Sequence, residues 1–336
     1  MNLKKIDNII IFGGTVNVLK ILNYLKKSRY EHHFFTSERM LKEIVNEKGT
    51  LRKNLKLLDI KYIIEKDINK SKKLIKIIKK NSLGIGIAEP WKFNKSIIKK
   101  FNTNLIDYMG IPLPRYRGGA HFTWMILQNE KNNGACFQHI NEKSEQGVYD
   151  SGDKIEYINY SNINNKIPID YFNKEAEIAF KIFKKLLFKI TNNKKIKYDK
   201  INESDSYYLP RLNTNINGWI NWQIWDADEI TNFINAFSFP YQGASSYIDT
   251  KRIFLRNAKI FKKGKYHPFQ SGLIIRINKN GLFVIAKKGI ILIKNYNFEN
   301  NKDNTPFIGQ RLFTPQNNLD ESLNYIPSYN SKGLKK

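Results

Sequence analysis

The sequence predicts an α/β domain built on a parallel, doubly wound sheet, followed by a smaller β-rich domain. In the first 190 residues, short apolar runs alternate with helix-like segments of crossover length. After a polar stretch the pattern changes to short apolar runs separated by Asn, Gly and Lys turns, which is typical of antiparallel strands. The chain has 336 residues, of which 41% are hydrophobic, enough for one large or two ordinary domains with substantial cores.

The first half opens with a strand, a tight turn and a helix. Ile9–Phe12 is followed by Gly13-Gly14-Thr15 and then by apolar residues at helical spacing from Val18 to Leu25. This turn lacks the spacing of a GxGxxG dinucleotide fingerprint. The same patterns predict strands at 33–35, 61–64, 83–88 and 105–106, and helices at 74–78, 96–101 and 172–190.

A loop with two prolines and two glycines follows the strand at 105–106 and leads into a helix from Phe122 to Leu127. The stretch closes on an acidic turn, Asp150 to Asp153. An α/β fold builds its sites outside the carboxyl ends of its strands, so Ala88-Glu89 and Asp107-Tyr108 are expected to form pocket walls. The alternative is that the prolines and glycines only shape a crossover.

The second half contains a polar segment and then a domain of short strands. Residues 191–215 are interpreted as a linker. Residues 216–315 predict a helix from Ala227 to Phe237 and a small β-barrel-like (OB-like) sheet. The Asn-, Ser- and Lys-rich tail, 316–336, is expected to be poorly ordered.

Composition limits the cellular setting. No apolar run is long enough to span a bilayer and no signal peptide is evident, so a cytoplasmic protein is expected. The single cysteine, Cys136, forms no CxxC pattern, and no metal site is expected. The net charge of +27 has two explanations: nucleic-acid binding, or an AT-rich genome, because 47 of the 57 basic residues are lysines among many Asn and Ile.

Several motifs in order resemble the formyltransferases that use 10-formyltetrahydrofolate, which include amino-sugar N-formyltransferases and methionyl-tRNA formyltransferases. The matching segments are Leu113–Gly119, Asp150–Asp153, Tyr208–Arg211, Gly218–Trp222 and Phe239–Ala244. The resemblance implies a Rossmann-like formyltransferase domain over 1–190 and a C-terminal formyltransferase domain over 216–315. The short C-terminal domain and the Arg-Gly-Gly-Ala-His form of the loop are more similar to the sugar enzymes.

The resemblance also implies catalytic residues. Asp150 falls on the aspartate that the family uses in proton transfer. The family's Asn-x-His pattern falls on Asp107 and Met109, so the amide and the imidazole are both replaced. A thioether neither donates a hydrogen bond nor carries a proton near neutral pH. A protonated Asp107 would supply a donor, and His121 is a candidate substitute imidazole.

The remaining roles follow from the same resemblance. The folate is expected between a first loop, which contains Ile87, Ala88, Glu89 and Trp91, and a second loop that includes Gly147 and Tyr149. Tyr116, Arg117 and Gly118 are the candidate acceptor-binding residues, although for Arg117 bracing of the loop is the favoured role. The expected acceptor is the amine of a nucleotide-linked amino sugar, and a homodimer is expected. Two alternatives stay open: a methionyl-tRNA formyltransferase, and an inactive homologue that serves as a binding protein.

Overall fold

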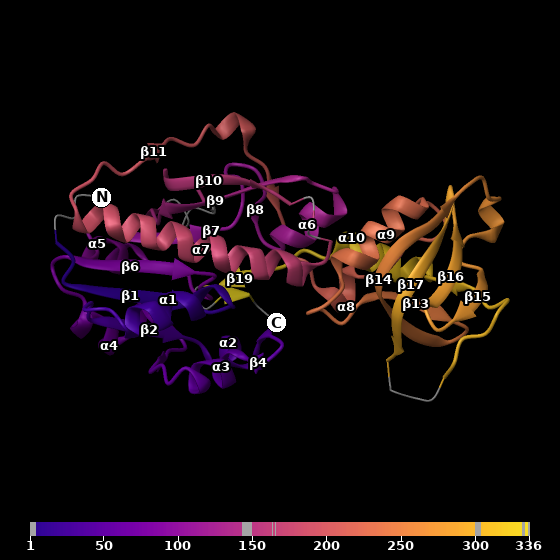
Figure 1. Ribbon diagram of the computed structural model, residues 1–336, viewed down its shortest axis with the longest axis horizontal. Coiled ribbons are helices and arrows are strands. Elements are labelled where there is room, and N and C mark those ends of the chain that lie inside the picture. Colours follow the sequence, from indigo (N-terminus) through magenta and orange to yellow (C-terminus); the bar gives the residue numbers. More distant parts are fainter. Residues whose placement is uncertain are drawn as a thin grey trace.

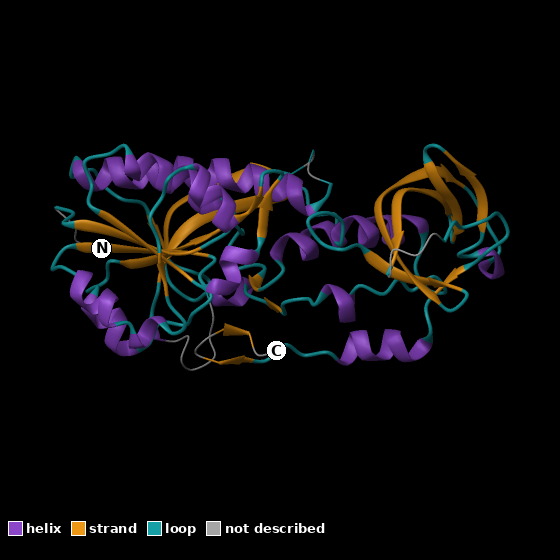
Figure 2. Ribbon diagram, turned by 90° about the horizontal axis from the view of Figure 1, so that it is seen from below, coloured by secondary structure: helices purple, strands orange, loops and turns teal. Residues whose placement is uncertain are grey.

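Two domains lie side by side along the long axis of the molecule (Figure 1). The computed structural model describes residues 5–142, 150–162, 164, 166–299, 304–330 and 333–334. The first domain is an α/β sheet covered by helices, and the second is a curled antiparallel sheet (Figure 2). The predicted fold class is confirmed.

An eight-stranded sheet forms the centre of the first domain, in the order β11-β10-β9-β7-β6-β1-β2-β5. The strands are β1 (Asn8–Gly13), β2 (His32–Thr36), β5 (Ile63–Ile64), β6 (Ser82–Ile87), β7 (Leu105–Met109), β9 (Asn132–His139), β10 (Lys154–Ser161) and β11 (Tyr198–Asp199). The prediction of a parallel sheet is right for β5, β2, β1, β6 and β7. It is wrong for β9, β10 and β11, which run antiparallel to their neighbours. The helix between β7 and β9, α6 (His121–Leu127), has seven residues. This helix spans only about 10 Å. It is too short to carry the chain back to the end of the sheet where β7 begins, as a parallel strand would require.

Helices cover both faces of this sheet, because successive apolar side chains along β1 point to opposite faces. Ile9 and Ile11 point into the core beneath α1 (Asn17–Lys26) and α7 (Pro168–Thr191), whereas Ile10 and Phe12 point into the core beneath α4 (Lys72–Ile77) and α5 (Lys95–Lys100). Because both faces are buried, the central strands are apolar runs without alternation. None of the described helices is long and apolar enough to cross a membrane.

Smaller elements surround the sheet. They are α2 (Glu38–Lys42), the hairpin β3 (Ile44–Asn46) and β4 (Gly49–Thr50), α3 (Leu51–Leu57), and β8 (Arg117–Gly118), which pairs with β12 (Tyr208–Leu209). The segment interpreted as a linker therefore contributes β11 to the main sheet and β12 to the loop beside the site. Its polar composition gave little sign of this, because strand pairing and a few apolar side chains, among them Ile196 and Leu209, hold the segment in place.

The second domain is a six-stranded antiparallel sheet beside one helix. Its order is β15 (Ile274–Asn278), β16 (Gly281–Ala286), β17 (Gly289–Phe298), β14 (Lys251–Lys263), β13 (Ala244–Ile248) and β18 (Leu312–Phe313). α9 (Ala227–Ala236) packs on this sheet and also on α6, so one apolar core runs through both domains. α8 (Thr214–Asn217) precedes α9 in the chain.

The expectation of a poorly ordered tail is wrong for residues 316–324, which form α10 (Gln316–Asn324). Leu319 on this helix is buried, and the Asn217 side-chain amide donates to the Ser322 carbonyl at 2.8 Å. The hairpin β19 (Tyr329–Asn330) and β20 (Gly333–Leu334) then returns toward the first domain (Figures 1 and 2). A single apolar side chain was too weak a sequence signal for this packing.

Candidate active site

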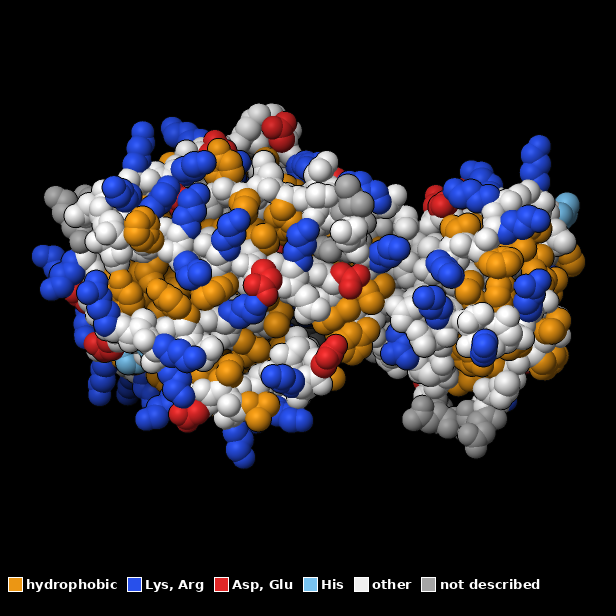
Figure 3. All heavy atoms as spheres, viewed as in Figure 1, with side chains coloured by type: hydrophobic (Ala, Val, Ile, Leu, Met, Phe, Trp, Pro, Cys, Tyr) orange, Lys and Arg blue, Asp and Glu red, His pale blue; other side chains and the backbone are white. Residues whose placement is uncertain are grey.

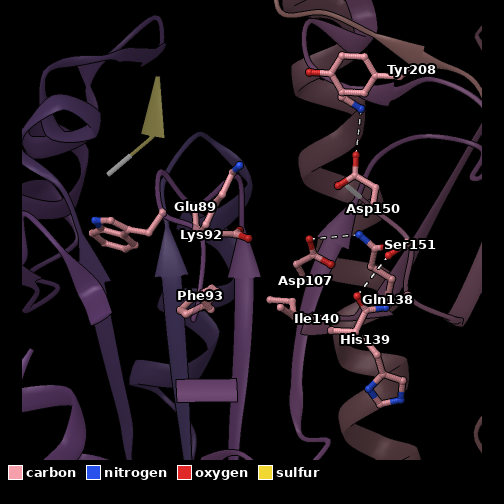
Figure 4. Close-up of a pocket in the computed structure, with 14 residues that line it drawn as sticks. Glu89, Lys92, Phe93, Asp107, Gln138, His139, Ile140, Asp150, Ser151 and Tyr208 are labelled. Atoms are coloured by element: carbon pink, nitrogen blue, oxygen red, sulfur yellow. Dashed lines mark hydrogen bonds between the residues drawn. The ribbon is translucent and has the colours of Figure 1, made fainter. Parts of the chain in front are cut away.

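The site lies at the carboxyl ends of β6 and β7. In the sheet register Asp107 stands between Gly86 of β6 and Gln138 of β9. The Gln138 side-chain amide donates to Asp107 Oδ2 at 3.3 Å (Figure 4). Asp107 Oδ1 and Gln138 Oε1 are both buried and have no hydrogen-bond partner in the described part of the chain. Two buried acceptors without donors favour binding of a ligand that carries N–H or O–H groups.

The Pro/Gly loop positions the acidic turn. The Gly118 N–H donates to Asp150 Oδ2 at 3.0 Å, and the Gly118 carbonyl lies 2.9 Å from His121 Nε2. Because a carbonyl only accepts, His121 carries its proton on Nε2 in this arrangement. Gly118 has φ +104°, and a Cβ there would lie 2.2 Å from the Leu209 carbonyl oxygen of β12. Only glycine fits this position. Through its N–H and its carbonyl, Gly118 contacts both Asp150 and His121.

Two cavities meet at these groups. The first, about 230 Å³, has apolar walls from Trp91, Phe93 and Ile140 and polar groups from β9 and the acidic turn. The second, about 420 Å³, extends between the two domains toward α2 and α8. Both are lined by the same four residues: Glu89, Asp107, Gly118 and Asp150. Figure 4 shows the first cavity, with Glu89 on one side and Asp107 and Asp150 on the other.

Burial dominates the electrostatics of the three carboxyls. It raises the pKa of Asp107 well above its ordinary value, with the charges of Glu89 and Asp150 adding to the effect. Burial also raises the pKa of Glu89 to about 7 and raises the pKa of Asp150. The pKa of His121 is lowered by burial, although Asp150 opposes the change, so the imidazole is neutral. The three carboxyls therefore keep their protons to a higher pH than exposed carboxyls do.

A fourth buried carboxyl, Glu175 on α7, lines the second cavity. It accepts hydrogen bonds from the hydroxyls of Tyr108 and Tyr160, the latter at 2.8 Å. Burial raises its pKa to about 7 even though both tyrosines favour the charged form. Gly110 leaves room for this carboxyl, because a Cβ there would lie 2.3 Å from Glu175 Oε1.

The structure brings most of the predicted site residues together. Trp91 lines the first cavity, Ala88, Met109 and His121 line the second, and Glu89, Asp107, Gly118 and Asp150 line both. Ile87 is fully buried inside β6 and is absent from the described lining of either cavity. Gly147 and Tyr149 lie outside the described residues.

Two predicted acceptor-binding residues are placed elsewhere. Tyr116 is buried, and its hydroxyl donates to Gln128 Oε1 at 2.6 Å. Arg117 is buried and donates to both carboxylate oxygens of Glu203, at 2.6 and 3.2 Å, and to Ser206. Neither is among the described residues that line the two cavities. Both side chains brace the loop against its neighbours.

Three residues at the site were missed from the sequence. Gln138 and Gly86 became visible only through the strand register, since neither belongs to a motif. Glu175 did leave a signal, because it is a carboxylate on the apolar stripe of α7 between Tyr171 and Ala179. The described residues contain no group of three His, Cys, Asp or Glu side chains that could hold a metal ion.

Comparison with known proteins agrees with this architecture. Residues 214–306 match the family model described as "Formyl transferase, C-terminal domain". Methionyl-tRNA formyltransferase of Clostridium tetani (strain Massachusetts / E88) is 26% identical over 254 residues, which cover 75% of this chain and 77% of the relative. The bifunctional polymyxin resistance protein ArnA of Wigglesworthia glossinidia brevipalpis is 27% identical over 195 residues, 58% of this chain and 28% of that protein.

Solved structures share the fold over nearly the whole chain. An N-formyltransferase from Helicobacter canadensis, in complex with folinic acid and dTDP-3-aminofucose, has a TM-score of 0.65 at 19% identity, covering 87% of this chain and 100% of that one. WlaRD, a sugar 3N-formyl transferase solved with dTDP and 5-N-formyl-THF, has a TM-score of 0.60 at 20% identity, covering 88% and 99%. The family model matched by the C-terminal domain, the curated relatives and the shared architecture agree with one another and confirm the resemblance of this chain to the formyltransferases.

Proposed function

We propose that this protein transfers a formyl group from 10-formyltetrahydrofolate to the amine of a nucleotide-linked amino sugar. The observation that carries the proposal is the position of the carboxyl cluster, at the junction of two separate cavities. A transfer between two substrates needs the donor and the acceptor to meet at a proton-handling group. Glu89, Asp107 and Asp150 stand at that junction.

The first cavity suits the flat, polar-edged ring of a folate. Trp91, Phe93 and Ile140 supply apolar walls, and the unpartnered oxygens of Asp107 and Gln138 supply acceptors for ring N–H groups. Solved relatives are described with folinic acid, 5-N-formyl-THF or tetrahydrofolic acid. When bound, the folate would supply the activated formyl group, and the chain's own residues would position the two substrates and transfer the proton.

The second cavity suits an anionic acceptor. Arg211 lines it together with Thr15, Asn17 and Thr214, and so does Arg39, which forms an ion pair with Glu43. Arginine forks match phosphate oxygens, so this wall fits a nucleotide diphosphate. dTDP and dTDP-3-aminofucose are the acceptor-side molecules described for the two sugar enzymes above.

Asp150 is placed to take the amine proton. Its carboxyl lines both cavities and is held by the Gly118 N–H. As the amine nitrogen bonds to the formyl carbon, it must lose a proton, and the ionised Asp150 accepts it. The proton then passes to the folate nitrogen as the bond between that nitrogen and the formyl carbon breaks.

Methionyl-tRNA is the second candidate acceptor. The net charge of +27 and the 75% coverage by a methionyl-tRNA formyltransferase favour it. On the face shown in Figure 3, however, the lysine and arginine side chains are spread over both domains rather than gathered in one tract. A tRNA site would show as affinity that falls steeply with salt.

The test is a formyl-transfer assay with 10-formyltetrahydrofolate against dTDP-, UDP- and GDP-linked amino sugars and methionyl-tRNA. The wild type should formylate a sugar, and Asp150→Asn should lose at least 100-fold in kcat. Asp153→Asn is the matched control, because Asp153 lies on the same turn but is exposed. Formylation of the tRNA alone would select the second candidate. Folate binding without turnover would leave a binding protein and refute both enzymatic assignments.

A further inference from the structure

Glu89 is bent back over the strand that precedes it. An added Cβ on Gly86 would lie 2.5 Å from Glu89 Oε2 and 2.7 Å from its Cδ, and 3.0 Å from Asp107 Cβ. The missing side chain of Gly86 therefore leaves room for the Glu89 carboxyl on the side of the strand where Asp107 also lies. The family pattern to which this chain is similar has an amide at the position of Asp107, so two neighbouring acids are a departure that needs an explanation.

The described part of the chain supplies no ion-pair partner for these acids. Among the described residues, no ion pair joins Glu89, Asp107 or Asp150 to a lysine or arginine. Two neighbouring, half-buried carboxyls without an ion-pair partner each raise the pKa of the other, because ionising both brings two like charges together. Among the described residues, the titratable and charged groups around Asp107 and its acidic neighbours are Glu89, Asp150, His121, Cys136 and Arg117, together with Lys92 and His139 in the first cavity and Arg39, Glu43, Glu175 and Arg211 in the second.

Asp107 offers a free atom for hydrogen bonding. Its Oδ2 accepts from Gln138, whereas its Oδ1 is buried without a partner and the residue lines both cavities. In the ionised state, Oδ1 would repel the negative charge that develops on the formyl oxygen. In the neutral state, an O–H at this atom supplies the donor that an amide would otherwise supply.

We propose that Glu89 is a positioning residue whose carboxyl, folded over Gly86, keeps Asp107 protonated, so that Asp107 donates a hydrogen bond to the formyl oxygen. This inference rests on the proposed formyl transfer. As the amine bonds to the formyl carbon, the carbonyl electron pair moves to oxygen, and the Asp107 O–H stabilises it while keeping its proton. The amine proton goes to Asp150, and the electron pair returns when the bond to the folate nitrogen breaks.

The first experiment needs no turnover. Infrared difference spectra of wild type minus Asp107→Asn, recorded across pH, isolate the carbonyl stretch of a protonated Asp107. That band should persist above pH 7 in the wild type. In Glu89→Gln the same titration should move to lower pH by about one to two pH units, because a neighbouring negative charge has been removed. Gly86→Ala, which displaces the Glu89 carboxyl but keeps its charge, should move it in the same direction.

The second experiment follows kcat against pH. The wild type should lose activity as pH rises through the Asp107 titration. Asp107→Ala should lose roughly 100- to 1,000-fold, as removal of an oxyanion donor does. Asp107→Asn should stay within about tenfold of the wild type and lose the alkaline fall, since an amide donates at every pH. Glu321→Gln, an exposed glutamate on α10, is the control and should match the wild type.

The outcomes separate this inference from the proposed function. A wild type that formylates no amine refutes the proposed function, and the infrared titration still decides whether Glu89 holds Asp107 protonated. An Asp107 band that is absent at pH 7 overturns the inference. So does an Asp107→Asn variant as inactive as Asp107→Ala, or an alkaline fall that Glu89→Gln leaves in place.

Discussion

Replacing Glu175 by glutamine should change how the stability of this protein depends on pH. Glu175 is 2% exposed, and burial raises its pKa from the ordinary 4.5 to about 7. Because the folded state holds the proton more tightly than the unfolded state, this acid costs stability as pH rises from about 4.5 to about 7. The difference corresponds to about 3 kcal/mol, at 1.36 kcal/mol for each pH unit. Glutamine is neutral throughout, has the same shape and still offers one oxygen to a tyrosine hydroxyl.

The expected result is a free energy of unfolding that is similar for both proteins at pH 4.5 but higher for Glu175→Gln at pH 8. The gain should be about 1 to 3 kcal/mol, because the lost charged hydrogen bond with one tyrosine offsets part of it. Urea unfolding followed by tryptophan fluorescence measures it, with the slopes compared to verify that the same transition is seen. Glu177→Gln, two residues along α7 and exposed in an ion pair with Lys20, is the control and should change stability by less than about 1 kcal/mol at either pH. Equal pH dependence in the wild type and Glu175→Gln would refute the reasoning.

Three further changes test the supports of the site. Gly118→Ala should abolish turnover and lower the melting temperature, because its Cβ would meet the Leu209 carbonyl at 2.2 Å; calorimetry and the transfer assay report this. Arg117→Lys should lower the free energy of unfolding by about 1 to 2 kcal/mol in urea titrations, because the two-pronged contact with Glu203 cannot be made by an ammonium, and an unchanged midpoint would contradict it. Leu319→Ala should cost about 2 kcal/mol if α10 is docked as described, measured in the same way, whereas a frayed tail would show no change.

The fold was largely predictable because its signals are local. Runs such as Ile9–Phe12 and Leu83–Ala88 are apolar without alternation, which marks strands buried on both faces. The direction of β9 was not predictable, since it depends on α6 being too short for a crossover. The ordered tail depends on Leu319 and one hydrogen bond to Asn217, contacts that no periodicity reveals.

Site residues that belong to a motif were predictable from the sequence, whereas those placed by the register between two strands were not. Asp107, Asp150 and Glu89 were named from strand ends and from the acidic turn, and all three line the junction of the cavities. Gln138 faces Asp107 only because β9 pairs with β7 in one register, and a shift by one residue would bring His139 there instead. For Arg117 the motif left two roles open, acceptor binding and bracing of the loop, and its partner Glu203, 86 positions later, could not be read from the motif.

The charge balance of the chain is itself an argument that the carboxyl cluster is functional. The sequence has 57 basic and 30 acidic residues, so a buried acid could easily have been given a cationic partner. Arg117 precedes Gly118, whose N–H binds Asp150, yet the Arg117 guanidinium pairs with Glu203, whose side chain is 57% exposed. Glu89, Asp107 and Asp150 thus stay without a partner lysine or arginine in the described structure, at a cost in stability that packing alone does not require. Unpaired acids with raised pKa values at the junction of two cavities are what proton transfer between two substrates needs. A purely structural role would instead favour their replacement by neutral or paired side chains.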